Sequence, residues 1–291
     1  SYQKFWEQVE GIDNPETSES VIEELRAIFR KIITERMTPR LRPKLPTTEG
    51  EILVKPAEAV ASIKAGITEP AVWETLEVRD RKQKLFGKFD VTVVADRSGS
   101  MQEGDETGAV KYVEQRKAVA LILEALTEFS QELDDVRRDL DQDLHVRTEA
   151  WSFGDEAQIE ILKPLSETLT EKERVAAYKK LGSAPGNSTM DYGALERIKN
   201  AIPPEDWQEI EEQKLRKIVI VLSDGDSSNA SETQRIIKEM REKGITVVGV
   251  GITKAANSIK TTYAPDGKVC PKAGDLGATL GKLLEEYLKD L

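Results

Sequence analysis

The sequence predicts an α/β fold with a doubly wound, mostly parallel central sheet, helices on both faces, and a helical N-terminal extension. After Phe89, short apolar runs alternate with longer amphipathic stretches, which is typical of βαβ units. Two of these runs, VTVVA and IVIVL, are continuously apolar apart from one threonine, as expected of central strands that are covered on both faces. Upstream, a separate amphipathic stretch runs from Ser18 to about Met37.

The part of the chain before the α/β domain divides into a helix, a linker and an arm. The helix begins with a capping Ser or Thr near Ser18 and repeats apolar residues at three- and four-residue steps. The stretch TPRLRPKLPTTEG is too rich in proline to stay helical, so an extended linker follows. The arm holds a short apolar start, a helix expected over Pro56–Lys64 and a basic patch. We therefore expect a helical extension and linker at 1–48, a connecting arm at 49–88 and the α/β domain at 89–291.

The α/β domain is expected to contain five strands joined by helices. The strand runs are either continuously apolar or alternate apolar with polar residues, and the stretches between them follow helical spacing. The expected strands lie at 89–96, 144–153, 157–165, 216–224 and 245–252. The expected helices lie at 110–133, 171–181, 191–201, 231–243 and 276–290.

Composition and charge exclude several classes of protein. The chain has 291 residues and a formal net charge of −11, so a basic face for binding nucleic acid is not expected. Cys270 is the only cysteine, which rules out an internal disulfide. No apolar run is long enough to span a bilayer, and the chain does not open on a signal-peptide pattern. We expect a cytoplasmic protein with neither a nucleic-acid nor a membrane partner.

Hydroxyl and carboxylate side chains gather where the expected strands end. Asp96, Ser98 and Ser100 follow the first strand at alternate positions, and Asp224 ends the strand that contains IVIVL. Thr189 lies in the loop GNSTMDYGAL, just before an expected helix. Ligands of doubly wound sheets bind beyond the carboxyl ends of the strands, and Mg²⁺ prefers oxygen ligands with waters and an open position. These five side chains therefore predict a divalent-metal site, for Mg²⁺ first and for Mn²⁺ or Ca²⁺ as alternatives.

A simpler interpretation is that Asp96 and the two serines cap backbone amides in a strand-to-helix turn. Thr189 and Asp224 lie at matching strand ends and also carry oxygen atoms, which favours the interpretation as a metal site. Asp191 can support the site or cap the helix that it starts. The same two roles are open for Asp226. His145 is the only histidine, so histidine-based triads and zinc catalysis are not expected.

In order and spacing, DRSGSM, the later threonine and LSDG resemble the metal-ion-dependent adhesion site of von Willebrand factor A-type (VWA) domains. The resemblance implies a Rossmann-like doubly wound fold over 89–291. In that family a carboxylate of a partner protein takes the remaining coordination position of the metal. The resemblance thus implies a binding module rather than an enzyme. It implies that the metal is ringed, directly or through water, by Asp96, Ser98, Ser100, Thr189 and Asp224.

A narrower resemblance concerns the segment that leads into the α/β domain. GEILVKPAEAV, ITEPAVWE and RDRKQKLFGKFDVTVVADRSGSM are similar to the run-in to VWA domains of proteins that work with MoxR-type AAA+ ATPases. Cobaltochelatase subunits and nitric-oxide-reductase activation proteins are examples, and they help a hexameric ATPase to remodel a metalloenzyme or insert its metal. This resemblance implies an adaptor whose partners include a hexameric AAA+ ATPase.

Two other functions stay open. A carboxylate at the end of the first strand, together with Mg²⁺, also describes phosphoryl-transfer hydrolases. Those enzymes commonly carry a second Asp two residues after the nucleophile, whereas Ser98 occupies that place here. Adhesion at a cell surface is the other alternative, and the lack of cysteine pairs speaks against it. We expect a metal-dependent interaction module that binds an acidic residue of a partner protein.

Overall fold

The computed structural model describes residues 2–37, 42–43, 52–53, 56–67, 73–74, 76–77, 86–140, 142–289 and 291. The chain forms two compact units. The larger unit comprises residues 1–35, 85–138 and 143–291, and the smaller unit comprises 36–84 and 139–142. Most of the predicted linker TPRLRPKLPTTEG lies outside the described residues, and the domain boundaries predicted near residues 48 and 88 stay a prediction.

A six-stranded sheet forms the centre of the larger unit. Its strands lie in the order β10–β9–β8–β5–β6–β7; the β6–β7 pair is antiparallel and the other pairs are parallel. The strands are β5 (Lys88–Asp96), β6 (His145–Phe153), β7 (Glu160–Ser166), β8 (Leu215–Ser223), β9 (Thr246–Ile252) and β10 (Gly267–Cys270). β5 is buried from Phe89 to Asp96 because helices cover both of its faces. The predicted doubly wound, mostly parallel sheet is confirmed.

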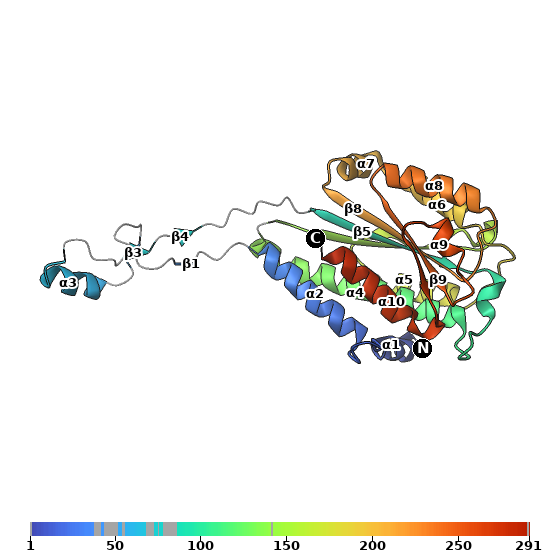
Figure 1. Cartoon of the computed structure of the whole chain (residues 1–291), viewed down its shortest axis with the longest axis horizontal. Coiled ribbons are helices and arrows are strands. Elements are labelled where there is room, and N and C mark those ends of the chain that lie inside the picture. The colour runs from blue at the N-terminus through green and yellow to red at the C-terminus, as the bar shows by residue number, and fades with distance from the viewer. Residues whose placement is uncertain are drawn as a thin grey trace. The chain divides into compact units, whose positions relative to one another are not determined.

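Helices cover both faces of this sheet (Figure 1). One face carries α6 (Asp191–Ala201), α7 (Pro204–Glu211) and α8 (Ala230–Glu242), where Leu195, Val221 and Ile237 belong to one buried apolar cluster. The other face carries α1 (Tyr2–Glu10), α2 (Val21–Arg36), α4 (Lys111–Val136) and α10 (Leu276–Leu288). The remaining helices of the unit are α5 (Glu171–Lys180), which packs against β7 and α4, and α9 (Ile259–Thr262), which packs against β9 and β10.

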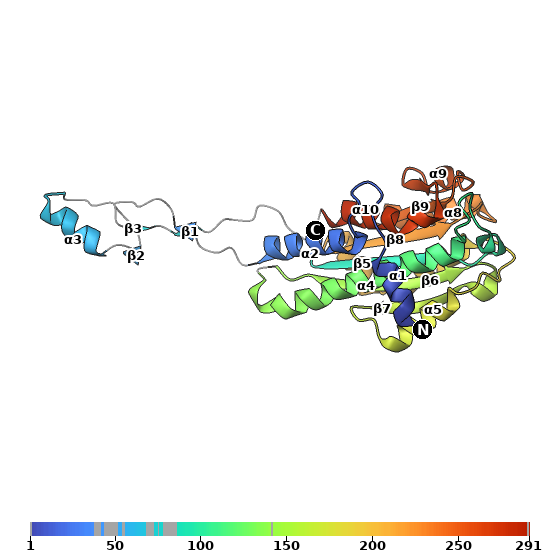
Figure 2. The ribbon, with the colours of Figure 1, turned by 90° about the horizontal axis from the view of Figure 1, so that it is seen from below.

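The N-terminal helices pack into the larger unit. Figure 2 shows α2 between α4 and α10. The Phe29 ring of α2 stacks on the Phe129 ring of α4, with 4.3 Å between their centroids. On the α10 side, a β-carbon at Gly281 would lie only 2.4 Å from Cγ1 of Val21, so glycine allows the two helices to touch. The predicted helical N-terminal extension is confirmed.

In the described residues of the smaller unit, the structure has one helix and two short antiparallel ladders. The helix α3 (Pro56–Lys64) has the predicted bounds, which confirms it. The ladders pair β1 (Arg42–Pro43) with β4 (Leu76–Glu77), and β2 (Ile52–Leu53) with β3 (Trp73–Glu74). No helix in the described part of the chain is both long enough and apolar enough to cross a membrane.

Several short elements of the larger unit depart from the prediction. The sequence did not reveal α1, α7, α9 or β10, and β10 has only four residues, too few for a period to show. The strand predicted at 157–165 begins at Glu160 instead. The reason is a 3₁₀ turn over Glu156–Gln158, which Asp155 caps by accepting a hydrogen bond from the Ala157 backbone N–H.

Candidate metal site

The carboxyl ends of β5 and β8 bring the predicted residues to one edge of the sheet. β5 and β8 are neighbouring parallel strands in which Ala95 pairs with Leu222. Asp96 therefore ends β5 next to the position where β8 ends and Asp224 follows. Ser98 and Ser100 lie in the turn after β5, so the strand register alone places both motifs together.

Three of the predicted side chains form one connected group of oxygen atoms, and a fourth, Asp96, joins it through a backbone N–H. Ser98 Oγ lies 3.1 Å from Ser100 Oγ, and Ser100 Oγ donates to Asp224 Oδ1 at 2.8 Å. Asp96 Oδ1 accepts a hydrogen bond from the Ser98 backbone N–H at 2.7 Å. Oxygens about 2.1 Å from a central ion in octahedral geometry lie about 3.0 Å from one another. The spacing and the chemistry of this donor set therefore fit a small, hard divalent ion.

Hydroxyl groups are essential to this donor set. In the part of the chain that the structure describes, no three His, Cys, Asp or Glu side chains converge in a way that could hold a metal ion. Two carboxylates, Asp96 and Asp224, carry the negative charge, and two serines complete the group. Such a mixed oxygen set favours Mg²⁺, Mn²⁺ or Ca²⁺ over ions that prefer nitrogen or sulfur.

Asp96 is fully buried and firmly held. Its Oδ2 accepts from Ser223 Oγ at 2.7 Å. Gln115 of α4 clamps the Asp96 backbone, donating from Nε2 to the carbonyl at 2.8 Å and accepting from the N–H at 3.1 Å. Burial raises the pKa of Asp96 to about 7; hydrogen bonds from Ser98 and Ser223 oppose the rise, and the nearby Asp224 charge adds to it. A bound cation would favour the ionised form.

Thr189 lies on the α5–α6 loop, which is fixed to both motifs through its backbone. Gly186 of this loop accepts from the Gly99 N–H at 2.7 Å and donates to the Arg97 carbonyl at 2.9 Å. The Thr189 N–H donates to Ser228 Oγ, at 2.9 Å, on the loop after β8. Among the described residues, no hydrogen bond joins the Thr189 hydroxyl to the other four predicted side chains. Its role as a metal ligand stays a prediction.

Asp191 is buried and connects the loops around the site. Its Oδ1 accepts from Ser227 Oγ and from Thr233 Oγ1, and its Oδ2 accepts from the Tyr263 hydroxyl at 2.7 Å. Burial raises the pKa of Asp191, and these hydrogen bonds oppose the rise. A β-carbon at Gly249 would lie 2.4 Å from the Tyr263 ring, so this glycine makes room for it. Asp191 Oδ1 also accepts from the backbone N–H of the next residue, in the first turn of α6, at 2.9 Å, so the contacts fit both interpretations left open for Asp191.

Lys111 is a residue of the site that the sequence did not reveal. It is the first residue of α4, and its ammonium donates to Asp224 Oδ2 at 2.7 Å and to the Ser100 carbonyl at 3.2 Å. No local motif marks it, because only the packing of α4 against the sheet brings it there. Asp226, in contrast, is exposed, and no contact within the described ranges ties its carboxylate to the oxygen group.

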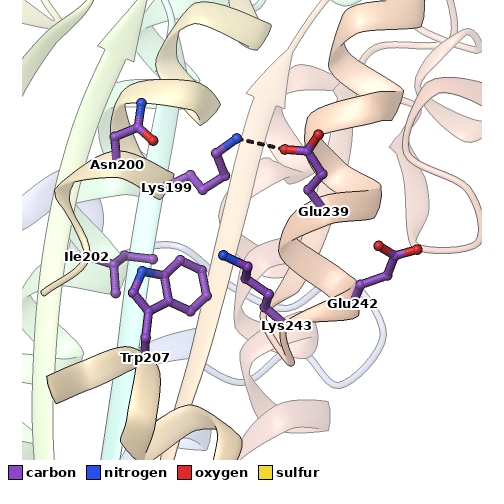
Figure 3. Close-up of a pocket in the computed structure, with 7 residues that line it drawn as sticks. All are labelled: Lys199, Asn200, Ile202, Trp207, Glu239, Glu242 and Lys243. Carbon is purple, nitrogen blue, oxygen red and sulfur yellow. Dashed lines mark hydrogen bonds and ion pairs between the residues drawn. The ribbon is translucent and has the colours of Figure 1, made fainter. Parts of the chain in front are cut away.

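A pocket of about 490 Å³ lies at the opposite edge of the sheet, between α6, α7 and α8 (Figure 3). α8 ends there, just before β9 begins, so this edge holds the amino ends of the strands. The pocket contains none of the predicted metal ligands. It is lined by Lys199, Asn200, Ile202, Trp207, Glu239, Glu242 and Lys243.

Comparison with known proteins identifies several similar chains. The family model of the von Willebrand factor type A domain matches residues 90–263, more than half of the chain. An uncharacterised protein of Treponema pallidum (strain Nichols) is 25% identical over 207 residues, which cover 70% of this chain and 33% of that protein. The chain therefore matches only about a third of the length of this relative.

Solved structures of two proteins show similarity at low sequence identity. Proximal thread matrix protein 1 from the mussel byssus has a TM-score of 0.48 and 18% identity, covering 71% of this chain and 49% of that chain. In one structure of that mussel protein, zinc occupies the metal-ion-dependent adhesion site (MIDAS) motif. The manganese-loaded TRAP protein of Plasmodium vivax has a TM-score of 0.39 and 13% identity, covering 67% of this chain and 72% of that chain.

Proposed function

This chain belongs to the von Willebrand factor type A domain family, and we propose that it is a divalent-metal-dependent module that binds an acidic residue of a partner protein. The observation that carries the proposal is the connected oxygen group of Ser98, Ser100 and Asp224 at the carboxyl edge of the sheet. Together with Asp96 and Thr189, these residues would hold the ion, with Mg²⁺ as the proposed metal. A bound dication would supply a Lewis acid that accepts the partner's carboxylate.

The contacts of Asp96 support binding over hydrolysis. A phosphoryl-transfer hydrolase needs a carboxylate oxygen that is free to attack the substrate. Asp96 is fully buried, its Oδ1 accepts from the Ser98 N–H and its Oδ2 accepts from Ser223 Oγ. Ser98 stands where such enzymes commonly carry an acid–base aspartate, and a hydroxyl exchanges protons poorly at neutral pH.

The proposed partner is part of an assembly driven by a hexameric AAA+ ATPase of the MoxR type. In this proposal the chain is a cytoplasmic adaptor, and the assembly matures or remodels a metalloenzyme. Support comes from the resemblance of the segment before β5 to the run-in of such adaptors. Much of that segment lies outside the described residues.

Water proton relaxation of the Mn²⁺-loaded protein tests the binding of a carboxylate. Bound Mn²⁺ that keeps coordinated waters enhances the relaxation, and a carboxylate that displaces water lowers the enhancement. We expect a peptide with a central Glu to lower it and the same peptide with Gln to leave it unchanged. Equal effects of the two peptides would contradict the proposal. Mg²⁺-dependent hydrolysis of a phosphate ester that is lost in Asp96→Asn would support the hydrolase instead.

A further inference from the structure

Lys111 places a buried cation inside the candidate metal site, where the metal-binding proposal leaves it without a role. Its side chain is only 9% exposed. The ammonium lies 2.7 Å from Asp224 Oδ2, 3.2 Å from the Ser100 carbonyl and 3.5 Å from Glu103 Oε2. An ammonium group has no lone pair, so Lys111 cannot itself be a metal ligand.

Helix formation does not explain the position of Lys111. A cation in the first turn of α4 opposes the positive end of the helix dipole. The preceding loop fixes it there instead: the Lys111 N–H donates to the Glu103 carbonyl at 3.2 Å, and the Asp105 carboxylate accepts from the backbone N–H groups of Thr107 and Ala109. The fold therefore holds this ammonium against Asp224.

The ammonium and a divalent ion would compete for one carboxylate. Asp224 Oδ1 accepts from Ser100 Oγ and Oδ2 pairs with Lys111, so both of its oxygens are engaged. A dication bound to Asp224 would lie close to the ammonium, and like charges at such a separation repel strongly in a buried site. The Glu103 side chain, which is 74% exposed and already lies 3.5 Å from the ammonium, offers it a second carboxylate toward which it can move when Asp224 binds the ion.

We propose that Lys111 is an internal counter-ion that neutralises Asp224 when the metal is absent. An entering metal ion displaces the Lys111 ammonium toward Glu103. This inference rests on the proposed metal site. It implies that the apparent metal affinity is lower than the oxygen ligands alone would give, because only molecules with Lys111 displaced can bind the ion. If the pair with Asp224 is closed in about nine molecules of ten, removing Lys111 tightens metal binding about tenfold.

Calorimetric titration with Mn²⁺ at neutral pH and fixed ionic strength tests this competition. Lys111→Met keeps the side-chain length without the charge, and Lys117→Met is the matched control, because Lys117 lies on the same helix and pairs with Glu114. We expect Mn²⁺ to bind Lys111→Met about tenfold more tightly than the wild type, Glu103→Gln more weakly, and the control equally.

Two results would overturn different claims. If the wild type binds Mn²⁺, Asp224→Asn does not, and Lys111→Met binds no more tightly than the wild type, the competition is wrong and the metal site stands. If neither the wild type nor Lys111→Met binds Mn²⁺, the proposed metal site itself is wrong, and the inference falls with it.

Amine labelling of the wild type gives a second measurement that does not depend on a variant folding. A short reaction with an acylating reagent, followed by peptide mass spectrometry, reports how exposed each lysine is. We expect saturating Mn²⁺ to raise the labelling of Lys111 several-fold and to leave that of Lys117 unchanged. Unchanged labelling of Lys111 at saturating Mn²⁺ would overturn the displacement.

Discussion

Asp96 is a buried carboxylate. Its protonation affects how the free energy of unfolding of the metal-free protein depends on pH. Its pKa is about 7 in the folded state, above the ordinary value for aspartate, because burial disfavours the charge. The folded state therefore takes up a proton at a pH where the unfolded chain stays ionised. The free energy of unfolding should rise as the pH falls from about 7 to about 5, by up to about 1 kcal/mol per pH unit.

Urea denaturation in EDTA across this pH range measures the effect. Asp96→Asn cannot ionise and should lose this part of the pH dependence. A wild-type slope that matches the slope of the variant would show that Asp96 does not titrate in this range.

At the residue scale, local motifs could be predicted from the sequence and distant partners could not. Asp96, Ser98 and Ser100 are neighbours in the chain, so their spacing alone indicates converging oxygens. Lys111 lies in the first turn of the helix expected at 110–133, a position that ordinarily leaves a lysine in solvent. Its burial, and the clamp that Gln115 places on Asp96, follow from how α4 packs on β5.

At the element scale, the loops of the site depend on a carboxylate and a tyrosine that lie far apart in the chain. Tyr263→Phe removes the donor to Asp191 Oδ2 and leaves a buried oxygen without that hydrogen bond. We expect a loss of about 1–3 kcal/mol in the free energy of unfolding. We also expect weaker Mn²⁺ binding, because Asp191 joins the loop of Thr189 to the loop after β8 through Ser227.

Denaturation and Mn²⁺ titration of the same samples check both effects. Tyr112→Phe is the matched control, because no hydrogen bond within the described part of the chain engages its hydroxyl. If Tyr263→Phe behaves as this control does, the Asp191 network does not support the site.

Long elements could be predicted because their patterns extend over several periods. β5 and β8 contain the runs VTVVA and IVIVL, and α6 has the predicted bounds. Short elements could not be predicted from the sequence because contacts with neighbouring elements stabilise them. β10 forms by pairing with β9, and α7 is fixed by Asp206, whose carboxylate accepts from Arg147 of β6 at 3.0 Å. Neither partner is close in sequence.

At the scale of the whole molecule, the N-terminal helices contribute to the core of the larger unit although they precede the family match. Phe29 is fully buried against Phe129. Phe29→Ala should therefore lower the free energy of unfolding by about 3–5 kcal/mol. The larger unit should still unfold in a single transition.

Urea denaturation, monitored by fluorescence and by circular dichroism, measures both the loss of stability and the number of transitions. Ile63→Ala, at a side chain that is 61% exposed, is the control and should change stability little. A small effect of Phe29→Ala, or a separate early transition of the N-terminal helices, would show that they are not integral to the unit.

The proposed function depends on a divalent ion at the carboxyl edge of β5 and β8. Calorimetric titration with Mg²⁺ tests this most directly, on the wild type, on Asp224→Asn and on Asp226→Asn, whose carboxylate is exposed and outside the oxygen group. We expect one ion per chain in the wild type and in Asp226→Asn, and none in Asp224→Asn. The absence of binding in the wild type, or equal binding in all three proteins, would contradict the proposed function.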